Sequence, residues 1–379
     1  MSFVFVGFGL LAFLSASILA IDVGMLMTAR NQAQNSADAG ALAGAVALFF
    51  DDYDDRTPSG PAVTSAITAA QSNDVMGEDV SVLPSDVEFL DDANGDPNQV
   101  RVTVYRHAMR GNPVSLLMAR YLGLRETGGV AATATAEVSP ANGMTCVKPF
   151  TIPDKWIENG NPPWDGDDTY DAFDNKGRPL PPSVADKYIP AADANGNVNP
   201  DYTGYNNERE RGQRLVIRAG TGTNITVSFY FSLAIGGVTG GDEYSWNIEN
   251  CNNLVMEWGD PLVQEPGNMV GPTIQGIEAL IAKDPNAFWN EVTNTVDGST
   301  YSGQSPRTFP IPLYDPEYYD SGKRNGRMAD LKVANWIGFF AESVSGNSIY
   351  GRIIPIAGIR TGNPDGPTNL FPKAIRLVK

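Results

Sequence analysis

The sequence predicts an α+β protein with three segments: a long N-terminal hydrophobic helix (1–50), a small α+β head (51–141) and a β-rich C-terminal domain with long loops (142–379). Three observations carry this prediction. Residues 3–21 contain no charge, and a helix-compatible composition continues without proline to residue 50. Residues 61–138 mix helical and alternating patterns. From residue 142 onward, Pro, Gly, Asn and Asp separate short β-type runs.

The N-terminal segment is predicted to be a helix that forms a hydrophobic stalk. Residues 3–21 would extend about 28 Å at 1.5 Å per residue, close to the hydrocarbon thickness of a bilayer. A buried core helix or a signal peptide would also be apolar. No Lys or Arg precedes Arg30, although signal peptides and cytoplasmic flanks normally carry such residues. We expect a membrane-spanning or filament-core helix whose basic leader was removed upstream of Met1.

Small residues recur every four positions after the apolar run. They are Ala33, Ala37, Ala41 and Ala45 in one series and Gly40 and Gly44 in another. Such a face lets other backbones approach closely, although alanine also favours helices in its own right. Because each glycine inside a helix costs about 1 kcal/mol relative to alanine, we predict that this small-residue seam serves filament or helix packing.

Three charged residues accompany the stalk. Asp22 ends the uncharged run, Arg30 follows it and Asp38 lies within the small-residue seam. Charges in such positions require water or a partner. We expect water, Arg30 or a neighbouring subunit to satisfy Asp22 and Asp38.

The two later segments can be divided into elements by their patterns. In the head we predict helices at 61–73 and 113–122 and strands at 80–90, 99–106 and 130–138. In the C-terminal domain we predict strands at 215–219, 225–233, 308–312, 333–342 and 348–356, helices at 273–283 and 285–292, and a long loop at 159–210.

The stalk also resembles a known family. The resemblance is carried by residues 20–24 and 29–45, followed by 100–104, 121–124, 131–136, 265–276 and 310–316. These stretches are similar to the TadE/TadG-like Flp (tight adherence) pilus-assembly family. The resemblance implies a pilin-like envelope protein without enzymatic activity, which works with the pilus-assembly machinery. Position 5 is Phe, where true type IV pilins have glutamate.

Composition and inventory restrict the function further. The chain has 44 acidic and 27 basic residues and a formal net charge of −17, which disfavours nucleic acid and anionic lipid as partners of the head. His107 is the only histidine, so a Ser-His-Asp triad has no second choice of base. Residues 297–301 begin like a metal-ion-dependent adhesion motif, but Tyr301 replaces its final serine.

Two further predictions concern the C-terminal domain. Cys146 and Cys251 are the only cysteines, and an exported protein favours a disulfide between them over two buried thiols. Oxygen-bearing side chains at Asp193, Asn195, Asn197 and Asp201 could hold calcium, although such tracts are also ordinary turns and no other cofactor is expected.

Three functions remain open at this point. The first is a homo-oligomeric filament subunit with stalks bundled in the core and acidic heads outside, anchored in the inner membrane before assembly. The second is a membrane-anchored TadG-like assembly or tip protein. The third is a membrane-tethered adhesin or hydrolase. The acidic loops and a group of aromatic residues in the long loop are consistent with it; these aromatics are Trp156, Trp164, Tyr170, Tyr202 and Tyr205.

Overall fold

The protein forms two compact units, and each is described by itself. The computed structural model describes residues 2–51, 55–92, 95, 97–121, 123–160, 164–166, 168–174, 176–193, 197–220, 224–324, 330–361, 367 and 369–378. The first unit comprises Met1–Ser139 together with Ile375–Lys379, and the second comprises Pro140–Ala374. The chain therefore returns to the first unit at its C-terminus, which a continuous domain at 142–379 did not include.

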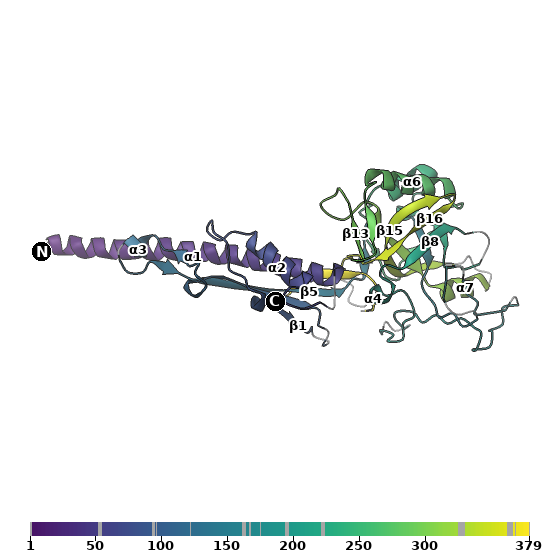
Figure 1. Cartoon of the computed structure of the whole chain (residues 1–379), viewed down its shortest axis with the longest axis horizontal. Helices are drawn as coiled ribbons and strands as arrows, with labels where there is room; N and C mark the ends of the chain where they lie inside the picture. The colour runs from purple at the N-terminus through teal and green to yellow at the C-terminus, as the bar shows by residue number, and fades with distance from the viewer. Residues whose placement is uncertain are drawn as a thin grey trace. The chain divides into compact units, whose positions relative to one another are not determined.

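The first unit is organised around α1 (Ser2–Phe50), a helix of 49 residues. No proline or cap interrupts it, and the hydroxyls of Ser15, Ser17 and Thr28 donate to backbone oxygens four residues earlier, so these polar groups are satisfied inside the helix. The C-terminal half of α1 packs against α2 (Pro61–Gln71), while its N-terminal part extends beyond the elements that cover it (Figure 1).

A four-stranded sheet completes this unit in the order β1–β2–β5–β17, with bounds Val87–Leu90, Gln99–Arg106, Val130–Pro140 and Lys373–Val378. Both β1 and β5 pair antiparallel with β2, and Val102 lies opposite Ala134. Because side chains alternate along a strand, Val100, Val102 and Val104 share one face and are fully buried towards the helices. Short elements connect these parts: η1 (Pro84–Asp86), η2 (Ala108–Arg110), β3 (Val114–Ser115), α3 (Met118–Tyr121) and β4 (Thr127–Gly128).

The second unit is built on a sheet that closes on itself. Its strands follow in the order β15–β14–β7–β9–β8–β16, and β16 also pairs with β15. Their bounds are Leu331–Ser345, Thr308–Tyr314, Phe150–Pro153, Phe229–Ser232, Arg214–Ala219 and Ser348–Ile354, and β11 (Pro261–Leu262) adds to the start of β15. The pairs β7–β14 and β8–β9 are parallel, and the others in the ring are antiparallel. The interior holds large apolar side chains, among them Phe150, Trp336 and Phe339.

Helices and small ribbons surround this closed sheet. The helices are α4 (Asn207–Glu210), η3 (Ile235–Gly237), α5 (Gly241–Glu249), α6 (Val270–Lys283) and α7 (Pro316–Arg324). The ribbons are β6 (Gly143–Met144) with β10 (Met256–Glu257) and β12 (Phe288–Asn290) with β13 (Thr295–Asp297). Helix α5 contacts α6 closely, because a Cβ on Gly276 would lie 2.6 Å from Ile248 Cγ2.

The predicted α+β class, with a long N-terminal helix and a β-rich C-terminal region, is confirmed. Some element boundaries are wrong. The helix predicted at 285–292 is wrong at Phe288–Asn290, which form strand β12 because they pair antiparallel with β13. The helix predicted at 113–122 is helical only in α3, since Val114 and Ser115 pair with β4.

Candidate functional site

The most conspicuous surface of the protein is the N-terminal part of α1. Phe3, Phe5, Phe8 and Phe13 are each more than two-thirds exposed. Consecutive positions 3–6 are all exposed, so the apolar surface surrounds the helix rather than forming a stripe. Among the residues that the structure describes, α1 is long and apolar enough to cross a membrane, and the most apolar part of it is not covered by the chain. This surface can bind lipid or other apolar helices.

The small-residue seam lies in the other half of α1 and is already filled. Ala33, Ala37, Ala41 and Ala45 are fully buried. A Cβ on Gly40 would lie 3.0 Å from both the Ala70 Cβ and the Ala66 backbone oxygen, and one on Gly44 would lie 2.9 Å from Val100 Cγ1. The seam thus packs against α2 and β2 of its own chain, which corresponds to the helix-packing part of the prediction. Larger residues at positions 40 and 44 would disturb the first unit itself.

Polar contacts fix the same half of α1. Ser36 Oγ donates to the Ala70 backbone oxygen at 2.7 Å, and Gln32 Oε1 accepts from Met76 N at 2.9 Å. Asp38 Oδ1 accepts from Gln34 Nε2 at 2.8 Å, one helical turn away, rather than pairing with Arg30, which is exposed. The helix is therefore anchored to the first unit from both its apolar and its polar faces.

Asp22 marks the boundary between the two halves. Its Oδ1 accepts from the backbone nitrogens of Leu117 (3.0 Å) and Met118 (2.9 Å), and its Oδ2 accepts from that of Ala119 at 2.6 Å. The N–H groups at the start of α3, which have no partner within that helix, thus donate to the buried carboxylate of Asp22. Asp22 takes the place of the side chain of an N-cap residue. Instead of water, Arg30 or a neighbouring subunit, the partner of Asp22 is thus backbone about 95 residues away in the sequence.

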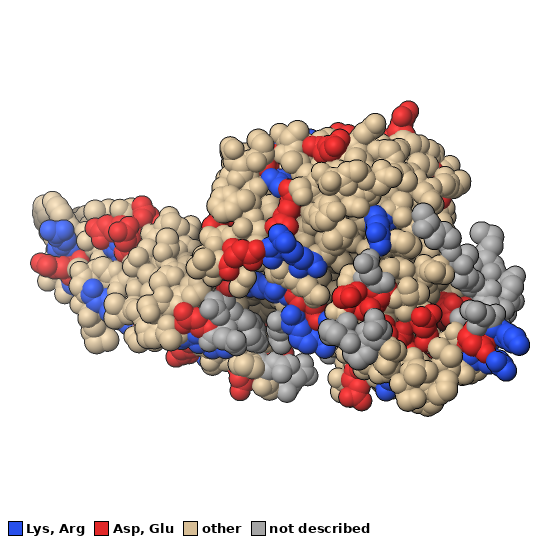
Figure 2. Space-filling model, turned by 45° about the vertical axis from the view of Figure 1, so that its right-hand side comes forward, with Lys and Arg blue, Asp and Glu red and all other residues tan. Residues whose placement is uncertain are grey.

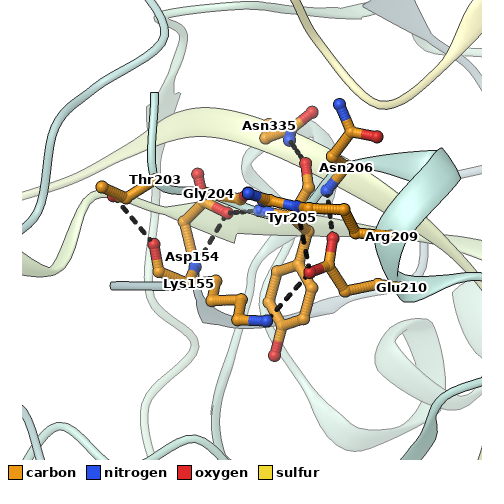
Figure 3. A network of polar contacts seen from close by, with 9 residues as sticks. All are labelled: Asp154, Lys155, Thr203, Gly204, Tyr205, Asn206, Arg209, Glu210 and Asn335. Atoms are coloured by element: carbon orange, nitrogen blue, oxygen red, sulfur yellow. Dashed lines mark hydrogen bonds and ion pairs between the residues drawn. The ribbon is translucent and has the colours of Figure 1, made fainter. Parts of the chain in front are cut away.

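A buried polar network organises the long loop of the second unit (Figure 3). Asp154 is fully buried and accepts from the backbone nitrogens of Lys155 (2.9 Å) and Tyr205 (3.0 Å) and from the hydroxyls of Tyr188 and Tyr202. Burial raises the pKa of Asp154 to about 6, and these hydrogen bonds only partly oppose the rise. Asn335 of β15 donates to the Tyr205 backbone oxygen at 3.0 Å, so the network ties the loop to the closed sheet.

The aromatic residues of this loop are core residues. Trp156, Tyr170 and Tyr205 are buried, and Trp164 and Tyr202 pack against the same core. The Trp156 and Trp164 rings lie edge to face with centroids 4.4 Å apart. These aromatics therefore belong to the core of the second unit rather than to an exposed adhesive surface.

The candidate calcium residues form a turn in the part that is described. Both carboxylate oxygens of Asp193 accept from Asn197, at 2.9 Å from its backbone nitrogen and 3.0 Å from its side-chain amide. Asn195 lies outside the described residues, and Asp201 is exposed. Within the described residues, no group of three His, Cys, Asp or Glu is placed to hold a metal ion. Calcium binding stays a prediction from the sequence.

The adhesion-like motif has a structural role. Asp284, buried at the end of α6, accepts from the hydroxyls of Ser299 and Ser305, each at 2.6 Å, and from the Thr300 backbone nitrogen at 3.1 Å. Burial raises the pKa of Asp284, but these hydrogen bonds outweigh burial and leave the pKa below its ordinary value. The hydroxyls of Ser299 and Thr300 in the motif thus fix this loop to Asp284 at the end of α6.

Cys146 and Cys251 form a disulfide that links residues 105 apart in the sequence. Next to it, the buried Lys148 donates to the backbone oxygens of Ile248 and Asn250, at the C-terminus of α5. Burial lowers the pKa of Lys148 to about 7, and the charge of Lys283 adds to the effect. The disulfide and Lys148 together secure the end of α5.

Comparison with known proteins matches the N-terminal part of the chain to a family model. Residues 1–47 match the family Tad, described as Flp pilus-assembly TadE/G-like. No curated protein and no solved structure matches the chain. The matched residues include the exposed apolar part of α1, Asp22 and the small-residue seam. Over residues 1–47, the N-terminal helix of this chain is therefore similar to the TadE/G-like Flp pilus-assembly family.

Proposed function

We propose that the chain is a membrane-anchored structural component of Flp pilus assembly, with residues 3–21 across the membrane and both folded units on its outer side. One observation carries the proposal: α1 is exposed on all sides from Phe3 to Phe13, and Asp22 is the first buried residue among those described, after which one face of the helix packs within the first unit. Exposing the apolar side chains of these 19 uncharged residues to water is unfavourable in free energy, whereas contact with lipid acyl chains is not.

The polar atoms of the exposed part suit this environment. The hydroxyls of Ser15 and Ser17 are bonded to Leu11 and Phe13 oxygens of the same helix, at 2.8 and 3.0 Å. Apart from the first four N–H groups at its start, the backbone groups of α1 in this part are likewise satisfied by the helix itself, as crossing a bilayer requires. The first charge, Asp22, accepts three hydrogen bonds from backbone donors of the first unit and so needs no partner in the membrane.

Charge and redox chemistry favour the outer side for both units. The chain carries a formal net charge of −17, and acidic and basic side chains lie among uncharged residues on the face drawn in Figure 2. The disulfide between Cys146 and Cys251 favours an oxidising compartment outside the cytosol. The role we propose is structural rather than catalytic, and the partner is the pilus-assembly machinery.

A filament subunit is the second candidate. The apolar surface that surrounds α1 at residues 3–17 would also suit a bundle of helices in a fibre core. Such a subunit would occupy the membrane before assembly, so the two candidates differ in fate and copy number. The anchor is preferred because the small-residue seam, for which filament packing was one of the two expected uses, is occupied by α2 and β2 of the same chain.

Fractionation of cells that express the chain tests the proposal. After surface filaments are sheared off, an anchor stays with the membranes, whereas a filament subunit leaves in the sheared fraction as its main protein. The matched variants are Leu11→Lys and Val46→Lys, which place the same charge on exposed positions of α1. A lysine at a membrane-spanning centre costs about 3 kcal/mol, so Leu11→Lys should lose membrane retention while Val46→Lys keeps it. Equal retention of both variants would contradict membrane anchoring.

A further inference from the structure

We infer that residues 117–121 and 123–125, which we call the foot, form a second membrane contact that lies in the lipid–water interface beside the point where α1 leaves the bilayer. The inference rests on the proposed anchoring of residues 3–21 and adds a site to it. The foot contains α3 and belongs to the first unit, and α3 lies against α1 near the N-terminal end of that unit (Figure 1).

The position of the foot along α1 is fixed by two contacts. Asp22 holds the backbone nitrogens of Leu117, Met118 and Ala119. One turn further on, Leu26 packs against β4, where a Cβ on Gly128 would lie 2.8 Å from Leu26 Cδ2. Since Asp22 is the first charged residue after the uncharged run, the foot is held level with the end of the proposed span.

The foot presents large apolar side chains to the outside. Leu117, Tyr121 and Leu124 are 60, 88 and 71% exposed, whereas the neighbouring Ala119 is buried. Exposure of the Leu side chains to water is unfavourable, and contact with acyl chains would remove this cost. Tyrosine prefers the membrane interface, where its ring contacts acyl chains and its hydroxyl contacts headgroups. Interfacial segments of other proteins likewise combine Leu and aromatic side chains with Lys or Arg.

The charge of the foot fits a phosphate-rich surface. Arg120 and Arg125 are its only charged residues, and both are exposed. Residues 97–125 contain no Asp or Glu, although the whole chain has a net charge of −17. The acidic composition disfavoured anionic lipid as a partner of the head, but this local segment is the exception. Each arginine near an anionic leaflet should favour contact by about fivefold.

A lipid surface explains both features of the foot together. The stalk of a second copy would cover the Leu and Tyr side chains, but its residues 2–21 carry no charge to pair with Arg120 and Arg125. Lipid headgroups supply that charge one layer above the acyl chains. With two attachments, the helix and the foot, the first unit could not rotate about the axis of α1, so its orientation on the membrane would be set.

Spin-label accessibility of the full chain in vesicles containing anionic lipid tests the inference. Single cysteines replace Tyr121 and Leu124 in the foot, Phe8 in the span and Leu83 as an exposed control elsewhere in the first unit. Cys146 and Cys251 are joined in the disulfide and are not labelled under non-reducing conditions. We expect labels at 121 and 124 to collide with oxygen more, and with a water-soluble nickel chelate less, than the label at 83.

The outcomes separate the two proposals. If the label at 8 meets oxygen but the labels at 121 and 124 match the label at 83, the foot inference is overturned while anchoring stands. If the label at 8 also meets the nickel chelate, anchoring itself fails. Magnetic interaction between labels at 121 on neighbouring molecules would assign the foot to a second copy and would likewise overturn the inference.

A charge variant provides the second measurement. Arg120→Gln with Arg125→Gln should lower the ratio of inserted to lifted foot by about 25-fold in anionic vesicles, because each arginine contributes about fivefold. Vesicles of neutral lipid should show little difference between this variant and the parent chain. Arg360→Gln, an exposed arginine of the second unit, is the matched control and should have no effect. An unchanged label position in the double variant would contradict the role of the arginines.

Discussion

Substitution of Gly44 by alanine tests the packing of the seam quantitatively. The new Cβ would lie 2.9 Å from Val100 Cγ1, 3.1 Å from the Ala66 Cβ and 3.3 Å from the Ala62 backbone oxygen. Carbon atoms normally rest about 3.5–4.0 Å apart, so α1 must move away from β2 or α2 by roughly half an ångström or more. Overpacking of this kind costs about 1–3 kcal/mol.

Gly24→Ala is the matched control, because nothing lies within 4 Å of a Cβ at position 24. Both substitutions gain about 1 kcal/mol of helix propensity, so the difference between the two variants isolates the packing cost. We expect Gly44→Ala to be less stable than Gly24→Ala by about 1–3 kcal/mol, or about 5- to 150-fold in the opening equilibrium of the first unit.

Hydrogen exchange of the full chain in detergent, read by mass spectrometry on peptides from α2 and β2, measures this difference. All six tryptophans lie between residues 156 and 336, so their fluorescence reports the second unit, which should unfold at an unchanged midpoint in both variants. Equal exchange of α2 and β2 in the two variants would refute the assignment of the seam to contacts within the chain.

Three further predictions concern single contacts. Asp22→Ala should speed hydrogen exchange of residues 116–126, because loss of a helix-capping carboxylate costs about 0.5–2 kcal/mol; exchange at the parent rate would contradict its capping role. Cys251→Ser should lower the stability of the second unit by about 4–5 kcal/mol in the chain-entropy model, seen as an earlier tryptophan unfolding transition, and a transition at the parent midpoint would contradict this. The pKa of Asp154 is raised from 3.8 to about 6, so its contribution to stability is full below pH 3.8 and is lost as pH rises through 6. Asp154→Asn should flatten the pH profile of unfolding in that window, and an unchanged profile would show that Asp154 does not titrate there.

The sequence allowed the first unit to be predicted well where one pattern governs one element. The alternation of Val100, Val102 and Val104 predicts β2 because every second side chain must face the helices. No comparable sequence pattern predicts that β17 joins this sheet. Its six residues, 373–378, include Lys373 and Arg376 and lack a strict alternation, so only the pairing with β5 reveals the strand.

In the candidate site, too, some features could be predicted from the sequence and others could not. Small residues at Gly40 and Gly44 indicate a close approach to another backbone, but they do not say whether that backbone belongs to the same chain or to another. Asp22 stood out as a charge that needs a partner, yet its partners are backbone N–H groups, which every residue except proline carries. Partners of this kind have no sequence signature, and only the fold brings them to the helix.

The central claim is that α1 lies in a membrane up to residue 21 and outside it from Asp22 onward. Phe13 and Met27 test it directly, because the two side chains are 70% and 64% exposed in the chain itself and lie on the same helix. A membrane-impermeant maleimide should label Met27→Cys in intact cells, whereas Phe13→Cys should react only after detergent removes the lipid. Equal labelling of both positions in intact cells would contradict the membrane span.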